Sequence, residues 1–70
     1  VSSLVNKGLD RILKKIGEEA GEVIIAAKND SKEEVLNESA DLLFHLILLL
    51  KSQGYSVNDV ASILANRHDA

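Results

Sequence analysis

The chain contains no cysteine, proline, methionine or tryptophan, and its 70 residues include only one phenylalanine, one tyrosine and four glycines. Without cysteine it has neither disulfides nor a thiolate metal site. Without proline and with little glycine, long uninterrupted helices are favoured. The longest apolar run, Leu46 to Leu50, is far shorter than the roughly 20 residues that span a membrane. These absences predict a small all-α protein with no membrane span.

Charge and length narrow the class of protein further. Acidic and basic residues are interspersed, the net charge is −3, and no basic stripe or aromatic platform is present, which argues against a nucleic-acid partner. The lack of methionine indicates that an N-terminal piece is missing, and with no visible signal peptide a cytoplasmic protein is the expectation. A single domain of this size has a small core, so oligomerisation or a bound ion is expected to stabilise it.

The apolar pattern predicts three helices. Apolar residues recur at steps of three and four from about Lys7 to Lys28, which is the pattern of an amphipathic helix. Ser31, with Glu34 three residues later, forms a capping box that opens a second helix running to about Gln53. A last helix begins after Ser56, followed by a polar tail at residues 66–70.

The second predicted helix is apolar over more than half of its circumference, so we expect it to be buried on most sides, as at the centre of a bundle. Gly54 is its natural C-terminal stop. The last helix has Ser56 as its N-cap and Asp59 in its first turn, and it is expected to cover the core as a lid. The predicted fold is therefore an antiparallel helical hairpin plus a short C-terminal helix, completing a helical bundle by dimerisation.

Two features of the first helix point to a neighbouring surface. The segment from Val23 to Ala27 is apolar on every side, so a second surface, such as another subunit, should cover Ile25. Gly17 and Gly21 each cost on the order of 1 kcal/mol relative to alanine inside a helix. Their spacing suggests close approach of another backbone or a ligand, and a merely tolerated loss is an equal alternative.

Two acidic motifs flank the turn around position 30. They are Glu18-Glu19-Ala20-Gly21-Glu22 and Glu38-Ser39-Ala40-Asp41. Glu22 and Glu38 are each eight residues from position 30, and Glu19 and Asp41 are each eleven. In an antiparallel hairpin rising about 1.5 Å per residue, the members of each pair lie level. Four carboxylates would then meet in one patch, which requires a cation to hold them.

Carboxylate oxygens from two facing helices suit Mg²⁺ or Mn²⁺. A magnesium ion held in this way would bind substrate phosphates and activate a water. Lys14, Lys15 and Lys28 lie on the first helix, where they could meet phosphate oxygens as point charges, and Lys15 is level with His45.

Each of these residues also has a simpler interpretation. Glu and Lys on a helix surface are most often a solvated face, and a histidine beside a leucine-rich run, such as His45, is more often a hydrogen-bonded core residue than a ligand or base. Glu38 and Asp41, however, interrupt a helix that is expected to be nearly all buried, and a buried carboxylate needs a partner. We therefore favour a metal site.

Longer strings surround the acids. They are Lys7-Gly8-Leu9-Asp10, Lys14-Lys15-Ile16-Gly17-Glu18-Glu19-Ala20, Glu22-Val23-Ile24-Ile25-Ala26-Ala27-Lys28-Asn29 and Ala40-Asp41-Leu42-Leu43-Phe44-His45-Leu46. The spacing of the acids resembles that of the MazG-like all-α nucleotide pyrophosphohydrolases. The strings resemble one branch, the phosphoribosyl-ATP pyrophosphohydrolases of histidine biosynthesis, over about Leu4 to Arg67.

The resemblance implies a Mg²⁺-dependent hydrolysis of phosphoribosyl-ATP to phosphoribosyl-AMP and pyrophosphate, by water attack at the α–β phosphate linkage, in a homodimer or higher homo-oligomer. The positions that match the family's metal-binding acids are Glu19, Glu22, Glu38 and Asp41. Glu18 matches the first acid of the motif, and Glu18 or Glu22 is a better candidate than His45 for the base that serves the attacking water. Lys15 and Lys28 would contact phosphates.

Two features depart from the family pattern. The family's extra N-terminal helix is absent, and Ser2 or Ser3 stands where a basic residue is common. The family's domain also occurs fused behind a cyclohydrolase, so this chain could be a fragment of such a fusion. Two other functions remain open: a house-cleaning pyrophosphohydrolase of another nucleoside triphosphate, and a metal-free helical dimerisation module with solvent-facing acids.

Overall fold

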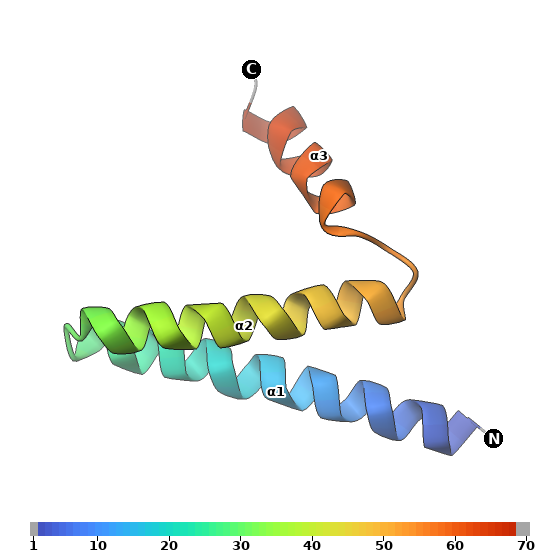
Figure 1. Cartoon of the computed structure of the whole chain (residues 1–70), viewed down its shortest axis with the longest axis horizontal. Helices are drawn as coiled ribbons and strands as arrows, with labels where there is room; N and C mark the ends of the chain where they lie inside the picture. The colour runs from blue at the N-terminus through green and yellow to red at the C-terminus, as the bar shows by residue number, and fades with distance from the viewer. Residues whose placement is uncertain (1, 69–70) are drawn as a thin grey trace.

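Three helices make up the chain in a computed structural model that describes the backbone of residues 2–68 and the side chains of residues 8–68. They are α1 (Ser2–Lys28), α2 (Lys32–Ser52) and α3 (Val57–His68). The α1 and α2 helices form an antiparallel hairpin, and α3 turns away from the end of α2 (Figure 1). The predicted all-α fold, with a hairpin and a short third helix, is confirmed. No helix in the described residues has the length and apolar character needed to cross a membrane.

The first helix is longer than the sequence pattern indicated. We expected it to begin near Lys7, but it begins at Ser2. Residues 2–6 carry no glycine or proline that would end a helix. Their apolar periodicity is weak, and for this reason the sequence pattern did not assign them to the helix. The last helix also runs further than expected, through His68, so most of the predicted polar tail is helical. Residues 69–70 of that tail lie outside the described part of the chain.

The turn between α1 and α2 is tight because the end of one helix is joined directly to the cap of the next. Asp30 adopts a left-handed backbone conformation (φ 56°), which aspartate tolerates better than most residues. The amides of Asp30 and Ser31 donate to the carbonyls of Ala27 and Ala26, in the pattern of a Schellman motif. Ser31 then serves as the N-cap of α2, and its hydroxyl accepts a hydrogen bond from the Glu34 amide at 3.4 Å.

The predicted caps are confirmed, with one change. In the capping box of α2, the Ser31 amide donates to Ala26 rather than to the Glu34 side chain, because the preceding turn already provides an acceptor. At α3 the box is reciprocal: the Ser56 amide donates to the Asp59 carboxylate at 2.9 Å, and the Asp59 amide donates to the Ser56 hydroxyl at 3.4 Å. The helix boundaries at both turns are therefore set by local chemistry.

Gly54 ends α2 as predicted. Its φ of 81° lies in the left-handed region, and the amides of Gly54 and Tyr55 donate to the carbonyls of Lys51 and Leu50 in a second Schellman motif. Within one chain, no other backbone approaches the glycines inside α1. A methyl group added at Gly17 or Gly21 would meet no other atom of the described chain within 4 Å.

These two kinds of glycine predict opposite effects for the same substitution. Gly54→Ala should lower the free energy of unfolding by about 1 kcal/mol, because alanine is strained at positive φ. Gly17→Ala should raise it by about 0.8–1.0 kcal/mol, because alanine is the better helix former and the space is open. Urea denaturation of both variants checks this, and a destabilised Gly17→Ala protein would instead show that another surface approaches that position.

The three helices form a single layer that leaves most apolar side chains uncovered. The shortest extent of the molecule is 13 Å, which is about the diameter of one helix with its side chains. Among the described residues Ala26 alone is a buried hydrophobic residue, and Ile25 is 61% exposed. The expectation that α2 is buried on most sides is therefore not met within one chain, since α2 has no buried residue.

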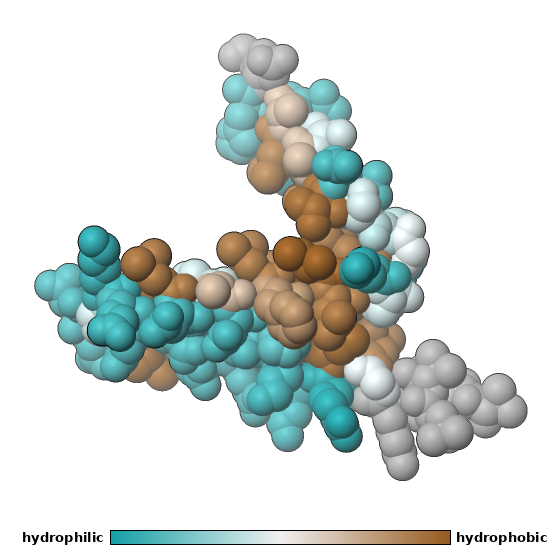
Figure 2. All heavy atoms as spheres, viewed as in Figure 1, coloured by the Kyte–Doolittle hydropathy of each residue, from teal (hydrophilic) through white to brown (hydrophobic). Residues whose placement is uncertain are grey.

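The third helix does not lie over the hairpin as a lid. It has no buried residue and meets α2 only near the connecting turn, so that an open apolar groove lies in the angle between them. The residues that line this groove are Leu43, Leu46, Ile47, Leu49, Leu50, Val57 and Val60. Figure 2 shows apolar residues gathered in this angle, whereas hydrophilic residues cover most of the turn end of the hairpin. For α3 to act as a lid, a second apolar surface would have to pack against it.

Candidate metal and phosphate site

Three carboxyl groups meet across the hairpin, one from α1 and two from α2. The side chain of Glu38 is within hydrogen-bonding contact of both Glu22 and Asp41. The hydrogen bond with Glu22, together with partial burial and the charges of both neighbours, raises the pKa of Glu38 from its usual 4.5 to about 7. The level placement of Glu22 and Glu38 is therefore as predicted. We call Glu22, Glu38 and Asp41 the carboxyl cluster.

Glu19, the fourth predicted metal-binding acid, faces a histidine of the opposite helix. Its Oε1 atom lies 2.6 Å from Nδ1 of His45, and the two side chains are only 12% and 19% exposed. The same Nδ1 lies 3.0 Å from the main-chain carbonyl of Asp41, to which its hydrogen points. Oε1 of Glu19 is thus buried without an aligned hydrogen bond from any described residue, and its contact with His45 is electrostatic.

The contact between Glu19 and His45 was not anticipated, because the distance from position 30 made Lys15 the level partner of His45. A helical side chain leans toward the N-terminus of its own helix. The imidazole of His45 therefore reaches back one turn, to the carbonyl of Asp41, and so meets Glu19. The direction of helical side chains, added to the residue count, would have predicted this pair.

The remaining predicted residues lie on the exposed part of α1. Lys15 and Glu18 line a shallow hollow along one face of this helix, together with Asp10, Arg11 and Lys14. Glu18 is one turn from Glu22 on the same face, so the hollow leads toward the carboxyl cluster. Lys28 lies apart, in the last turn of α1, about 9 Å along the axis from Glu22.

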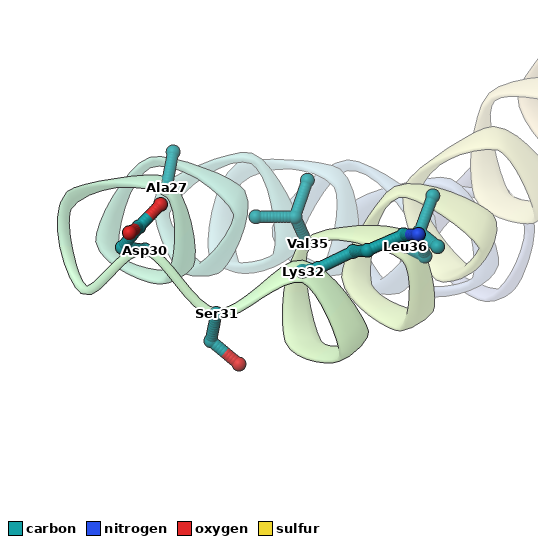
Figure 3. Close-up of a pocket in the computed structure, with 6 residues that line it drawn as sticks. All are labelled: Ala27, Asp30, Ser31, Lys32, Val35 and Leu36. Carbon is teal, nitrogen blue, oxygen red and sulfur yellow. The ribbon is translucent and has the colours of Figure 1, made fainter.

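A second hollow lies at the turn and does not involve the acids of either motif. Its lining residues are Ala27, Asp30, Ser31, Lys32, Val35 and Leu36 (Figure 3). It is mostly apolar and is a consequence of the tight turn. The side chains of Ser2 and Ser3, the positions noted in the sequence as a departure from the resemblance, lie outside the described part of the chain.

The acids fit a hard divalent cation in their chemistry, although their side chains are not gathered around one point. Within the described residues, no three Asp, Glu or His side chains are arranged as a ready set of metal ligands. Oε1 of Glu19 is nevertheless buried without a hydrogen-bond partner, and Glu38 holds a proton near neutral pH because two carboxyl groups face it. All four acids offer oxygen, the donor that Mg²⁺ and Mn²⁺ prefer. A cation would take the place of the shared proton.

The carboxyl cluster predicts that the metal-free protein loses stability as the pH rises. Because the pKa of Glu38 is higher in the folded chain (about 7) than its usual 4.5, the folded state binds this proton more tightly. The stabilisation is complete below pH 4.5 and is lost as the pH passes 7. Thermal melts in chelator between pH 5 and 8 should show a falling midpoint, and Glu38→Gln should flatten the fall. An equal fall in both proteins would contradict the assignment to Glu38.

Comparison with known proteins gives the family of the chain. The family model described as phosphoribosyl-ATP pyrophosphohydrolase matches residues 1–68. The bifunctional histidine biosynthesis protein HisIE of Thermus thermophilus is 59% identical over 97% of this chain and 32% of its own length. The phosphoribosyl-ATP pyrophosphatases of Streptococcus gordonii and Leptospira biflexa are 56% and 55% identical over 94% and 96% of this chain.

The chain spans 64% of the Streptococcus protein and 73% of the Leptospira protein. It thus covers most of the shorter relatives and about a third of the bifunctional one. The family match extends across both acidic motifs and both helices that carry them. The resemblance noted in the sequence is confirmed, and the chain belongs to the phosphoribosyl-ATP pyrophosphohydrolase family.

Proposed function

We propose that this protein hydrolyses phosphoribosyl-ATP to phosphoribosyl-AMP and pyrophosphate with Mg²⁺ as its cofactor. The observation that carries the proposal is the carboxyl cluster, which brings Glu22, Glu38 and Asp41 together across the hairpin. The names of the relatives in Streptococcus and Leptospira support the substrate. Because this chain spans only part of its relatives, the proposal concerns the whole protein. We place this activity in the cytoplasm, in line with the expectation from the sequence.

Four acids are proposed to hold the metal. They are Glu19, Glu22, Glu38 and Asp41. When bound, Mg²⁺ or Mn²⁺ supplies charge neutralisation for phosphate oxygens and lowers the pKa of a bound water. The buried oxygen of Glu19 and the raised pKa of Glu38 support this set, because both acids need a positive partner when they are ionised.

The other residues are assigned by their place on α1. Glu18 is exposed and lies one turn from Glu22, so these two carboxylates are proposed to orient the attacking water and accept its proton. Lys15 lines the hollow that leads toward the cluster and is proposed to contact the phosphates as a point charge. Lys28 is proposed as a further phosphate contact at the end of α1, where its charge also favours the helix C-terminus.

We further propose that a second copy of the chain covers the apolar groove and the exposed apolar residues of the hairpin. A domain is normally built from at least two packed layers, and this chain provides one. Leu36, Phe44 and Ile25 each keep about 60% of their surface exposed. A homodimer, or a higher homo-oligomer, would supply the second layer and complete the bundle.

The test of the proposed function is pyrophosphate release from phosphoribosyl-ATP, with ATP and dUTP as parallel substrates, each with and without Mg²⁺. We expect metal-dependent turnover of phosphoribosyl-ATP alone. Turnover of ATP or dUTP instead would keep the metal site and replace the substrate with another nucleoside triphosphate. Absence of turnover on all three by a folded, full-length protein would overturn the proposal in favour of a helical interaction module.

A further inference from the structure

The imidazole of His45 is held in one orientation by its surroundings. Its Nδ1 donates to the Asp41 carbonyl at 3.0 Å, one turn earlier on the same helix. The neighbouring ring of Phe44 lies against it in an edge-to-face arrangement, with the ring centroids 5.1 Å apart and the planes at 84°. With a side chain that is 19% exposed, the ring is fixed by a hydrogen bond and by packing.

The two oxygens around Nδ1 determine which nitrogen carries the hydrogen. A main-chain carbonyl and a carboxylate are both acceptors, and both lie within 3.0 Å of Nδ1. Nδ1 must therefore be the N–H side of the ring, whether or not the other nitrogen is protonated. A nitrogen that carries a hydrogen offers no lone pair, so Nδ1 of His45 is neither a metal ligand nor a base toward these oxygens.

Glu19 has a competing partner that would draw it away from α2. Lys15 precedes Glu19 by four residues, and residues at this spacing are neighbours on a helix surface. Glu19 instead points across the hairpin, with Oε1 at 2.6 Å from His45. Among the described side chains, this is the one contact within 4.0 Å between a carboxylate and a basic side chain, and it joins the first acidic motif to the helix that carries the second.

We propose that His45 is a positioning residue that holds the Glu19 carboxylate at α2, beside Asp41, so that the acid from α1 is in place before a metal binds. The proposal rests on the metal site of the proposed function. The Nδ1–H edge of His45, whose hydrogen points to the Asp41 carbonyl, lies against the Glu19 oxygen and holds it by electrostatic attraction. Removal of a group that orients a metal ligand from outside the ligand set typically costs roughly 10- to 100-fold in metal affinity. The structure thus gives His45 a role in affinity for the cation, separate from the chemistry of hydrolysis.

The experiment measures Mn²⁺ and Mg²⁺ binding to the folded protein by calorimetry, without substrate, for three variants. His45→Asn keeps an N–H at the position of Nδ1, whereas His45→Gln moves it to the position of Nε2 and His45→Leu removes it. We expect His45→Asn to bind within about 3-fold of the parent, and the other two to lose roughly 10- to 100-fold. His68→Asn, on an exposed histidine of α3, is the matched control and should bind normally.

The outcomes separate this proposal from the one it rests on. If the parent protein binds neither metal, the proposed metal site fails. If the parent binds and all three variants bind equally well, or His45→Asn loses as much as His45→Gln, the positioning role is overturned and the metal site stands. Circular dichroism reports whether each variant is folded. If the His45→Leu protein is unfolded, the metal affinities of His45→Asn and His45→Gln still distinguish two roles. A loss in His45→Gln alone shows that the position of the N–H matters, whereas equal affinities show that the side chain only fills space.

Discussion

Glu38→Gln and Asp41→Asn are each expected to lower turnover of phosphoribosyl-ATP by at least about 100-fold, the scale seen when one preorganised electrostatic contact to a transition state is removed. Both changes keep the size of the side chain and remove its charge. Because Glu38 already meets Glu22 and Asp41, the loss of one charge also relieves repulsion within the carboxyl cluster. Helical content should therefore stay the same or rise slightly, as circular dichroism can show beside the rate measurement.

Glu33→Gln is the matched control for this loss. Glu33 is an exposed acid in the first turn of α2, so the substitution makes the same change of charge on the same helix away from the carboxyl cluster. It should leave turnover unchanged and cost about 0.3–1 kcal/mol of stability, because an acid favours a helix N-terminus. Full activity in both Glu38→Gln and Asp41→Asn, with metal present, would contradict the proposed metal site.

Ile47→Asp is expected to weaken self-association by at least about 30-fold. Ile47 lies in the apolar groove between α2 and α3 and is 41% exposed in the single chain. If a second copy covers this groove, a charge there loses its water without gaining a partner, and a central interface position of this kind typically contributes 2 kcal/mol or more. Sedimentation equilibrium gives the dissociation constant directly.

Asn37→Asp serves as the control for the added charge. Asn37 is exposed on the same helix and does not line the groove. The association constant of the Asn37→Asp protein should equal that of the parent. The melting temperatures of the parent and of the Asn37→Asp protein should both rise with protein concentration. A parent protein that stays monomeric at every concentration would show that something other than a second copy covers the apolar surface.

The helices and their ends could be predicted because their causes are local. Ser31 and Ser56 cap α2 and α3 as expected, since a hydroxyl beside free amides needs no distant partner. Gly54 ends α2 because the left-handed conformation favours glycine. The start of α1 was placed five residues too late, because apolar periodicity indicates which face of a helix is buried and not where its backbone begins.

The candidate site was predictable in part for the same reason. Counting residues from the turn placed Glu22 opposite Glu38, because two antiparallel helices rise at the same rate. It did not predict that His45 would meet Glu19, since that contact depends on the lean of side chains along the helix as well as on the level of their Cα atoms. The hollow beside Lys15 and Glu18 was also invisible in the sequence, because it depends on which side of α1 the hairpin leaves open.

The sequence by itself determined the helical hairpin, its caps and the family to which the chain belongs, because periodicity, capping residues and motif spacing are properties of short stretches. Only the tertiary structure decided that Glu19 pairs with His45, that Glu38 is the acid with the raised pKa, and that α3 stands away from the hairpin as part of one uncovered layer. These features depend on the distance and direction between side chains of different helices. Such distances are set when helices pack, and no single stretch of sequence contains them.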